Sequence, residues 1–155
     1  MSFRELDLKR SYISYGGDNI AHAFLTPALM HTKLYRRSVG YFSSNVITSI
    51  IDGIVALARN GGKIQLIASP NLSAEDINAI NIGYHMREEI IKKAFEHDFA
   101  TALEELDDSA LQLLATLIAD EILDIKIAVT SKSGIYHDKL GILEDFDGNI
   151  ITFYG

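Results

Sequence analysis

The chain has 155 residues, 48% of them hydrophobic, no cysteine and a net charge of −7. These values fit one domain over residues 1–155 and exclude disulfides and zinc sites built from thiolates. The acidic balance argues against a chain that holds a polyanion without a local basic patch or a partner. The N-terminus lacks the apolar stretch of a signal peptide, and no apolar run approaches the ~18 residues of a membrane span, so we expect a soluble, cytoplasmic protein.

The first half of the chain predicts a strand, a helix and a second strand. Pro27 fits the first turn of a short helix, and residues 36–43, RRSVGYFS, have the composition of a strand. Apolar residues recur at helical spacing over 45–60, and KIQLIAS at 63–69 then alternates like a strand. This order is typical of a βαβ unit with a parallel strand pair and a right-handed crossover.

Two further regions are predicted to be helical. Ser73 and Asp76 have the spacing of a capping box, and an apolar stripe runs on from Tyr84 to Leu106. The next helix, predicted over 109–123, is apolar on most sides. Such a helix needs cover on most sides, either from its own core or from a partner.

The C-terminal part reads as strands: LDIKIAV at 123–129, IYHDKLGILED at 135–145 and IITFYG at 150–155. Asp147-Gly148 between the last two runs predicts a hairpin. The chain as a whole therefore predicts an α/β fold with a mixed, mostly parallel sheet flanked by helices, ending in an antiparallel hairpin.

Charged residues interrupt the apolar pattern of the strand predicted at 135–145. Strand alternation puts His137, Lys139 and Gly141 on one face. An imidazole, an ammonium and a position without a side chain can together receive a phosphate, because Lys is a compact cation and neutral His is a nucleophile or proton carrier near pH 7. The alternative is a polar surface hairpin that binds nothing.

The same segment resembles a known signature. HDKLGILED followed by DGNIITFYG resembles the H-x-K-x-x-x-x-D motif of the phospholipase D superfamily, in which the motif strand, a turn and a second strand end in Gly-Ser-x-Asn. Upstream, GYFS and NGGKIQLIASP resemble the opening half of the version found at the N-terminus of bacterial DEAD/DEAH-type helicases and restriction-like proteins. The resemblance runs from about Phe24 to Gly155 and implies a phospholipase D-like half-domain.

The resemblance implies a phosphodiesterase, here a nuclease, that uses neither metal nor cofactor. His137 would be the nucleophile or the acid, through a phosphohistidine, and Lys139 would hold the phosphate oxygens. The acidic motif position falls on Glu144, whereas strand alternation puts Asp145 on the face of His137, so both are candidates. Gly141 and Gly155, which fills the Gly of Gly-Ser-x-Asn, are the implied substrate-binding glycines.

Three departures from the family pattern shape the expected partners. The chain supplies one motif where the chemistry needs two, the Ser and Asn expected after Gly155 are absent, and the surface is acidic. We therefore expect a fragment of a longer protein that is weak or inactive alone, with its second motif in the missing part or in a homodimer. Nucleic acid is the implied substrate, and no membrane is involved.

Two other function classes stay open. The first is a non-catalytic phosphate-binding, nucleic-acid-binding or docking module attached to a helicase motor. The second, a lipid phosphodiesterase, is disfavoured because the sequence has no membrane segment or basic amphipathic helix.

Other candidate residues lie at the two ends of the first strand of the βαβ unit. Ser43 and Ser44 come at the end of its first strand, where ligands of open α/β sheets gather, so both are candidate substrate-binding residues. The basic residues Lys33, Arg36 and Arg37 form either a solvated edge or a contact to a phosphate backbone.

Overall fold

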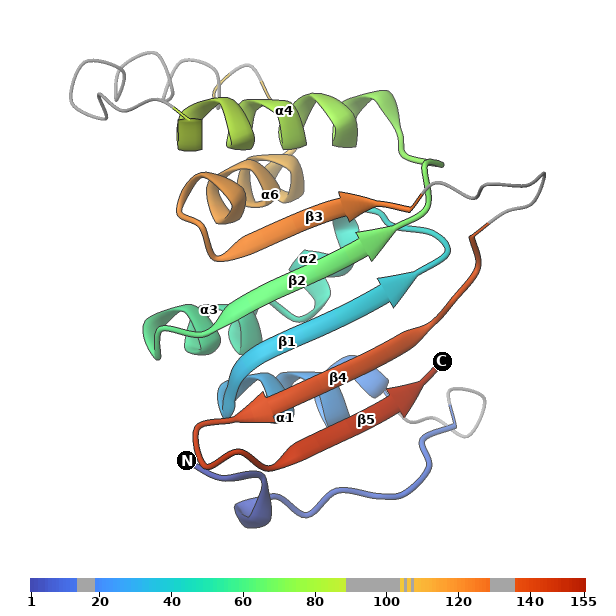
Figure 1. Ribbon diagram of the computed structural model, residues 1–155, viewed down its shortest axis with the longest axis vertical. Coiled ribbons are helices and arrows are strands. Elements are labelled where there is room, and N and C mark those ends of the chain that lie inside the picture. Colours follow the sequence, from blue (N-terminus) through green and yellow to red (C-terminus); the bar gives the residue numbers. More distant parts are fainter. Residues whose placement is uncertain (14–18, 89–103, 105, 107, 129–135) are drawn as a thin grey trace.

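Five strands form a single mixed sheet in the order β3-β2-β1-β4-β5 (Figure 1). The computed structural model describes residues 1–13, 19–88, 104, 106, 108–128 and 136–155. Its strands are β1 (Thr32–Val39), β2 (Lys63–Ala68), β3 (Leu123–Ile127), β4 (Leu140–Asp145) and β5 (Ile150–Tyr154). Strands β1, β2 and β3 are parallel, β4 is antiparallel to β1, and β5 is antiparallel to β4. The predicted α/β fold with a terminal hairpin is confirmed.

The predicted βαβ unit joins β1 to β2 through two helices, α2 (Asn45–Ser49) and α3 (Ile51–Arg59). One helix was expected over 45–60, but the backbone of Ile50 leaves the helical region, with φ −124° and ψ 23°, and divides it. The first strand is also shifted from the predicted 36–43 to Thr32–Val39, because the chain leaves the sheet at Gly40 to begin the connection to α2.

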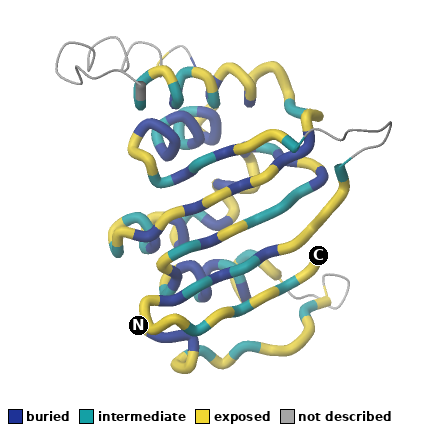
Figure 2. The backbone as a smooth tube through the Cα atoms, viewed as in Figure 1, coloured by how far each residue is buried: buried dark blue, intermediate teal, exposed yellow. Residues whose placement is uncertain are grey.

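The helices directly before and directly after β1 in the chain cover one face of the sheet (Figures 1 and 2). Burial alternates strictly along β2: Ile64, Leu66 and Ala68 are buried, and the residues between them are exposed. We call the buried side the covered face and the opposite side the open face. The remaining short helices are η1 (Phe3–Glu5), η3 (Ala21–Leu25) and α1 (Thr26–Met30), which has Pro27 in its first turn as predicted.

The apolar helix α6 (Ser109–Ala119) is covered within its own chain. It packs against α4 (Ala74–Glu88), where a Cβ added at Gly83 would lie 2.7 Å from both the Ala115 carbonyl oxygen and the Ile118 Cβ. Contacts with α2 and β3 add cover on other sides. Most of the predicted stripe from Tyr84 to Leu106 lies outside the described residues, and the helix predicted over 109–123 ends at Ala119.

Polar side chains cap the starts of helices α4 and α6. The Ser73 hydroxyl accepts a hydrogen bond from the Asp76 backbone N–H at 2.9 Å, as the capping-box spacing predicts, and it also donates to the Asp76 carboxylate at 3.0 Å. At α6 the cap is Asp108, whose carboxylate accepts from the Ala110 N–H at 2.7 Å. The extended backbone of Asp108 places its short carboxylate within reach of the free N–H groups at the start of the helix.

The C-terminal hairpin is shorter than predicted. Strand β4 begins at Leu140, not at 135, and residues 136–139 have no regular secondary structure. The turn after Asp145 contains Gly148 at φ +79°, a conformation that favours glycine. Within the described part of the chain, no helix is both long enough and apolar enough to cross a membrane.

Candidate functional site

His137 and Lys139 lie in the segment that leads into β4, and both are exposed. Because β4 is antiparallel to β1, this segment lies at the end of the sheet where the parallel strands finish (Figure 1). Ligands of open α/β sheets bind at this end. The two residues are therefore presented to solvent at the edge where ligands of such sheets are found.

The backbone around the two residues is held from both sides. The hydroxyls of Tyr136 and Ser38, on β1, share a hydrogen bond of 2.5 Å. The Gly155 N–H donates to the Lys139 carbonyl at 2.9 Å, and the Lys139 N–H donates to the Asp138 carboxylate at 3.0 Å. These contacts fix the path of the chain and leave the His137 and Lys139 side chains exposed.

His137 packs directly against the backbone of Gly40. A Cβ added at Gly40 would lie 2.7 Å from His137 Nδ1 and 2.9 Å from its Cα. The nearest atoms do not include Nε2, so the Nδ1 side of the ring is the one that packs on the Gly40 backbone. This arrangement leaves Nε2 as the nitrogen better placed to reach a ligand.

The gap expected beside Gly141 is filled. Gly141 is buried and pairs with Phe153 of β5, and an added Cβ would fall within the Phe153 ring. His137 and Lys139 precede the strand, so strand alternation does not govern their side chains. Gly141 therefore admits an aromatic ring, not a substrate.

The basic cluster expected around the first strand is divided between the two faces of the sheet. The Arg37 guanidinium lies 4.9 Å from the centre of the Phe153 ring and donates to the Gly155 carbonyl at 2.6 Å. Arg36 lies on the open face, with Nη1 3.7 Å from the Glu144 carboxylate and Nε 3.3 Å from Gln65 Oε1. Both arginines thus have partners within the chain.

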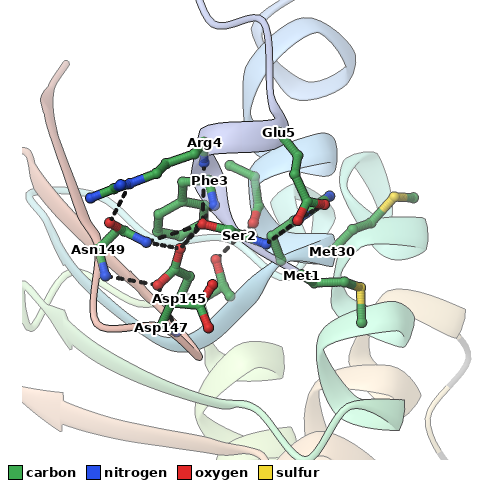
Figure 3. A network of polar contacts seen from close by, with 12 residues as sticks. Met1, Ser2, Phe3, Arg4, Glu5, Met30, Asp145, Asp147 and Asn149 are labelled. Atoms are coloured by element: carbon green, nitrogen blue, oxygen red, sulfur yellow. Dashed lines mark hydrogen bonds and ion pairs between the residues drawn. The ribbon is translucent and has the colours of Figure 1, made fainter.

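Asp145 anchors the N-terminus at the other end of β4 from His137 (Figure 3). One oxygen of its buried carboxylate accepts from the Phe3 N–H at 2.8 Å, the Asn149 side-chain amide at 2.8 Å and the Ser2 hydroxyl at 3.2 Å. The other accepts from the backbone N–H groups of Asn149 and Asp147, at 2.7 and 2.9 Å. Burial raises the pKa of this carboxyl, but the hydrogen bonds from Phe3, Asn149 and Asp147 outweigh burial and hold the pKa well below its usual range.

Neither acidic candidate joins His137. Asp145 is 1% exposed and is surrounded by its own donors, so it does not face the exposed His137. Glu144 points to the open face, where it pairs with Arg36. Strand alternation put Asp145 on the face of His137, and within β4 Asp145 does share the buried side with Gly141 and Leu143. The length of β4 nevertheless separates Asp145, its last residue, from His137, which precedes its first.

Ser43 and Ser44 lie elsewhere. Both line a cavity of about 490 Å³, and the Ser44 N–H donates to the buried Asp76 carboxylate at 3.2 Å. Glu75 and Asp108 also line this cavity, and its described lining does not include His137 or Lys139. An acidic lining disfavours a phosphate, so the structure does not bring these serines into one site with the motif.

Sequence reasoning missed Gly40 and Tyr136 as parts of the site. Both contacts join residues about a hundred positions apart, and no local pattern signals them. Gly40, a glycine inside the predicted strand 36–43, was the one available sign of a close backbone approach. Searches of protein-family models, curated proteins and solved structures found no match to this chain.

Proposed function

We propose that this chain provides one half of a metal-independent phosphodiesterase site that cleaves nucleic acid, within a larger helicase- or restriction-type protein of the cytoplasm. The observation that supports the proposal is the exposure of His137 and Lys139, two residues apart, where the parallel strands end, with His137 seated on Gly40. The resemblance of HDKLGILED to the phospholipase D motif supplies the reaction class.

In the proposed reaction, the lone pair of His137 Nε2 attacks phosphorus, and the bond from phosphorus to the leaving oxygen breaks with its electron pair. A second imidazole gives that oxygen a proton. Water, deprotonated by the same second imidazole, then displaces His137 and releases the phosphate monoester. Lys139 holds the non-bridging oxygens and offsets their charge.

The second imidazole comes from a second copy of the chain or from another part of a longer protein. His31 and Lys33 repeat the H-x-K spacing, but they lie where β1 begins, at the end of the strand away from Gly40. The same strand thus separates these residues from His137 by its whole length.

The test is cleavage and binding by the full chain, with bis(p-nitrophenyl) phosphate and a single-stranded oligonucleotide as probes. We expect His137→Gln to lower the cleavage rate about 100-fold or more and Lys139→Met to lower it by a similar factor. The matched controls are His22→Gln and Lys63→Met, two exposed residues outside the site, which should leave the rate unchanged. A phosphoryl adduct that is labile in acid and depends on His137 would support the mechanism.

Chelation separates this chemistry from metal-assisted cleavage. Activity should persist in EDTA, because a protein nucleophile and an ammonium replace the metal. Activity that EDTA abolishes and magnesium restores would contradict the proposal, as would cleavage that survives His137→Gln.

A non-catalytic phosphate-binding module is the second candidate. It is favoured by the single motif and by the exposed position of His137 and Lys139, which are not among the described residues that line the cavity beside Ser43 and Ser44. Its signature is oligonucleotide binding that needs Lys139 but no turnover at any protein concentration.

A further inference from the structure

Tyr41 is a large aromatic residue that the fold leaves in solvent, one residue from the contact between Gly40 and His137. Consecutive Cα atoms are about 3.8 Å apart, so Tyr41 begins next to the backbone against which His137 packs. The loop that joins β1 to α2 carries Gly40 and Tyr41 and lies at the end of the sheet where β4 begins (Figure 1). Tyr41 is 73% exposed, at the same edge as the exposed His137 and Lys139.

The residues that follow Tyr41 hold its backbone in place. Phe42 is 7% exposed and belongs to the hydrophobic core, and the N–H of the buried Ser44 donates to the Asp76 carboxylate at 3.2 Å. Within the described residues, the Tyr41 hydroxyl has no hydrogen-bond partner and the ring stacks on no other aromatic ring or cation. A single exposed aromatic residue is ordinary at a protein surface, so the position of Tyr41 beside the motif is what gives it meaning.

An aromatic face close to a phosphate-binding cation suits a nucleobase. Proteins that bind single strands combine positive charge for the phosphates with aromatic rings on which the bases stack, and every base has a π-face to stack. Here Lys139 supplies the charge and Tyr41 supplies the ring. Bases inside a duplex stack on one another and must be unstacked before a side chain can cover them, so this pair of residues favours an unpaired strand.

The cavity of about 490 Å³ beside Tyr41 offers room for the rest of a nucleoside. Tyr41 lines it together with Ser43, Asn45 and Asn78. Hydroxyl and amide groups both donate and accept hydrogen bonds, so they match the edges of bases and the hydroxyls of a sugar. The carboxylates in the same lining repel a phosphate and leave it to Lys139.

Hydrogen bonds within the chain already use two of these carboxylates. Asp76 accepts from the Ser44 N–H and the Ser73 hydroxyl, and Asp108 caps α6. Among the residues that the structure describes, no group of three or more His, Asp or Glu side chains is arranged to hold a metal ion. The negative lining therefore acts by excluding anions, which separates this cavity from the phosphate position at Lys139.

We propose that Tyr41 and the adjoining cavity form a base site: the Tyr41 ring stacks on the nucleobase next to the phosphodiester that His137 and Lys139 engage, and the substrate is single-stranded nucleic acid. This inference deepens the proposed function and rests on it for the position of the phosphate. Tyr41 determines specificity and takes no part in breaking the bond to phosphorus. Its loss should therefore raise KM and leave kcat nearly unchanged.

The first measurement compares two p-nitrophenyl phosphodiesters, the thymidine 5′-ester and the methyl ester, which share a leaving group and differ in the nucleoside. The nucleoside should raise kcat/KM at least about fivefold, the smallest effect expected from one stacked base. Tyr41→Ala should remove this advantage through KM and leave hydrolysis of the methyl ester within about twofold, and Tyr41→Trp should restore the advantage. The matched control is Phe146→Ala, an exposed ring after the far end of β4, which should change neither ester.

The second measurement is binding without turnover, by fluorescence anisotropy of a labelled strand of about ten nucleotides, alone and as a duplex. The full chain should bind the single strand at least about fivefold more tightly, and Tyr41→Ala should remove this preference at an unchanged unfolding temperature, because the ring is exposed. Absence of ester hydrolysis together with single-strand binding that depends on Tyr41 would refute the phosphodiesterase and support the base site. A preference for the thymidine ester or the single strand that survives Tyr41→Ala, equal affinity for single strand and duplex, or no binding of the single strand would overturn the base site, whether or not His137 cleaves.

Discussion

His137 rests on Gly40: a Cβ at position 40 would lie 2.7 Å from His137 Nδ1 and 2.9 Å from its Cα. Both distances are below ordinary van der Waals contact, and one of them involves backbone. This close packing therefore requires a residue without a side chain at position 40, although the φ of Gly40 lies outside the left-handed region that favours glycine. Position 40 is constrained by its neighbour and not by its own backbone.

Gly40→Ala should displace His137 while the protein stays folded. We expect the NMR signals of the His137 imidazole to shift and phosphodiester cleavage to fall at least about tenfold, since a misplacement of about 1 Å can cost about 100-fold in rate. Thermal unfolding should change little, because His137 is exposed and its segment can move outward. Unchanged imidazole signals and unchanged cleavage would contradict the claim that Gly40 positions His137.

Gly141→Ala should destabilise the protein by about 1–3 kcal/mol, because the new methyl group enters the space of the Phe153 ring. Phe153→Leu alone should also destabilise it, but the double variant should lose less than the sum of the two, which chemical denaturation measures. Additive losses would mean that the two positions do not compete for the same space. A phosphate-binding role for Gly141 predicts instead that the single variant loses binding at unchanged stability.

Asp145→Asn should remove the anchor of the N-terminus. The change replaces a buried acceptor of five hydrogen bonds by an amide that has one acceptor oxygen. Hydrogen bonds to charged groups contribute about 1.5–3 kcal/mol each, so we expect a loss of about 3 kcal/mol or more at pH 7. Asp147→Asn, an exposed neighbour, is the control and should change stability little.

The same residue gives a pH dependence with a defined sign. The pKa of Asp145 is lower in the folded chain than the ~3.9 of an unfolded Asp. Its contribution is therefore fully present above the unfolded pKa and is lost as pH falls below about 4 towards the folded value. Urea denaturation at a series of pH values should show the wild type losing stability more steeply than Asp145→Asn in this range. Parallel curves would refute the assignment.

The sequence predicted the local features of this fold and missed the distant ones. The capping pair Ser73 and Asp76 is three residues apart, and the alternation of KIQLIAS is visible within seven residues, so both features could be predicted from the sequence. The sequence did not show the contacts between more distant residues: Gly40 with His137 in the site, and, outside it, Gly141 with Phe153 and Asp145 with Phe3. Strand parity holds along β4 but does not apply to His137 and Lys139, which precede the strand, and nothing local showed that β4 begins at Leu140.

The last prediction concerns the second half of the proposed site. Helix α6 is covered by α4 and by the rest of its own fold, so it does not require a second copy as its composition suggested. What remains is the need for a second imidazole and the position of β5, which pairs only with β4 among the described strands and so leaves a sheet edge. A twofold dimer would supply both halves of the site from two copies of one chain.

A dimer of this chain must overcome a charge of −7 on each copy. Salt screens such repulsion over about 10 Å at 0.1 M and about 3 Å at 1 M, so association should strengthen as ionic strength rises. Sedimentation velocity at low and high salt measures this directly, without the loss of nucleic-acid binding that salt also causes. Cleavage of bis(p-nitrophenyl) phosphate should rise with the dimer fraction, because a single copy holds one motif. A strict monomer under both conditions that still cleaves robustly would refute the requirement for two halves, and a silent monomer would place the second imidazole in another part of a longer chain.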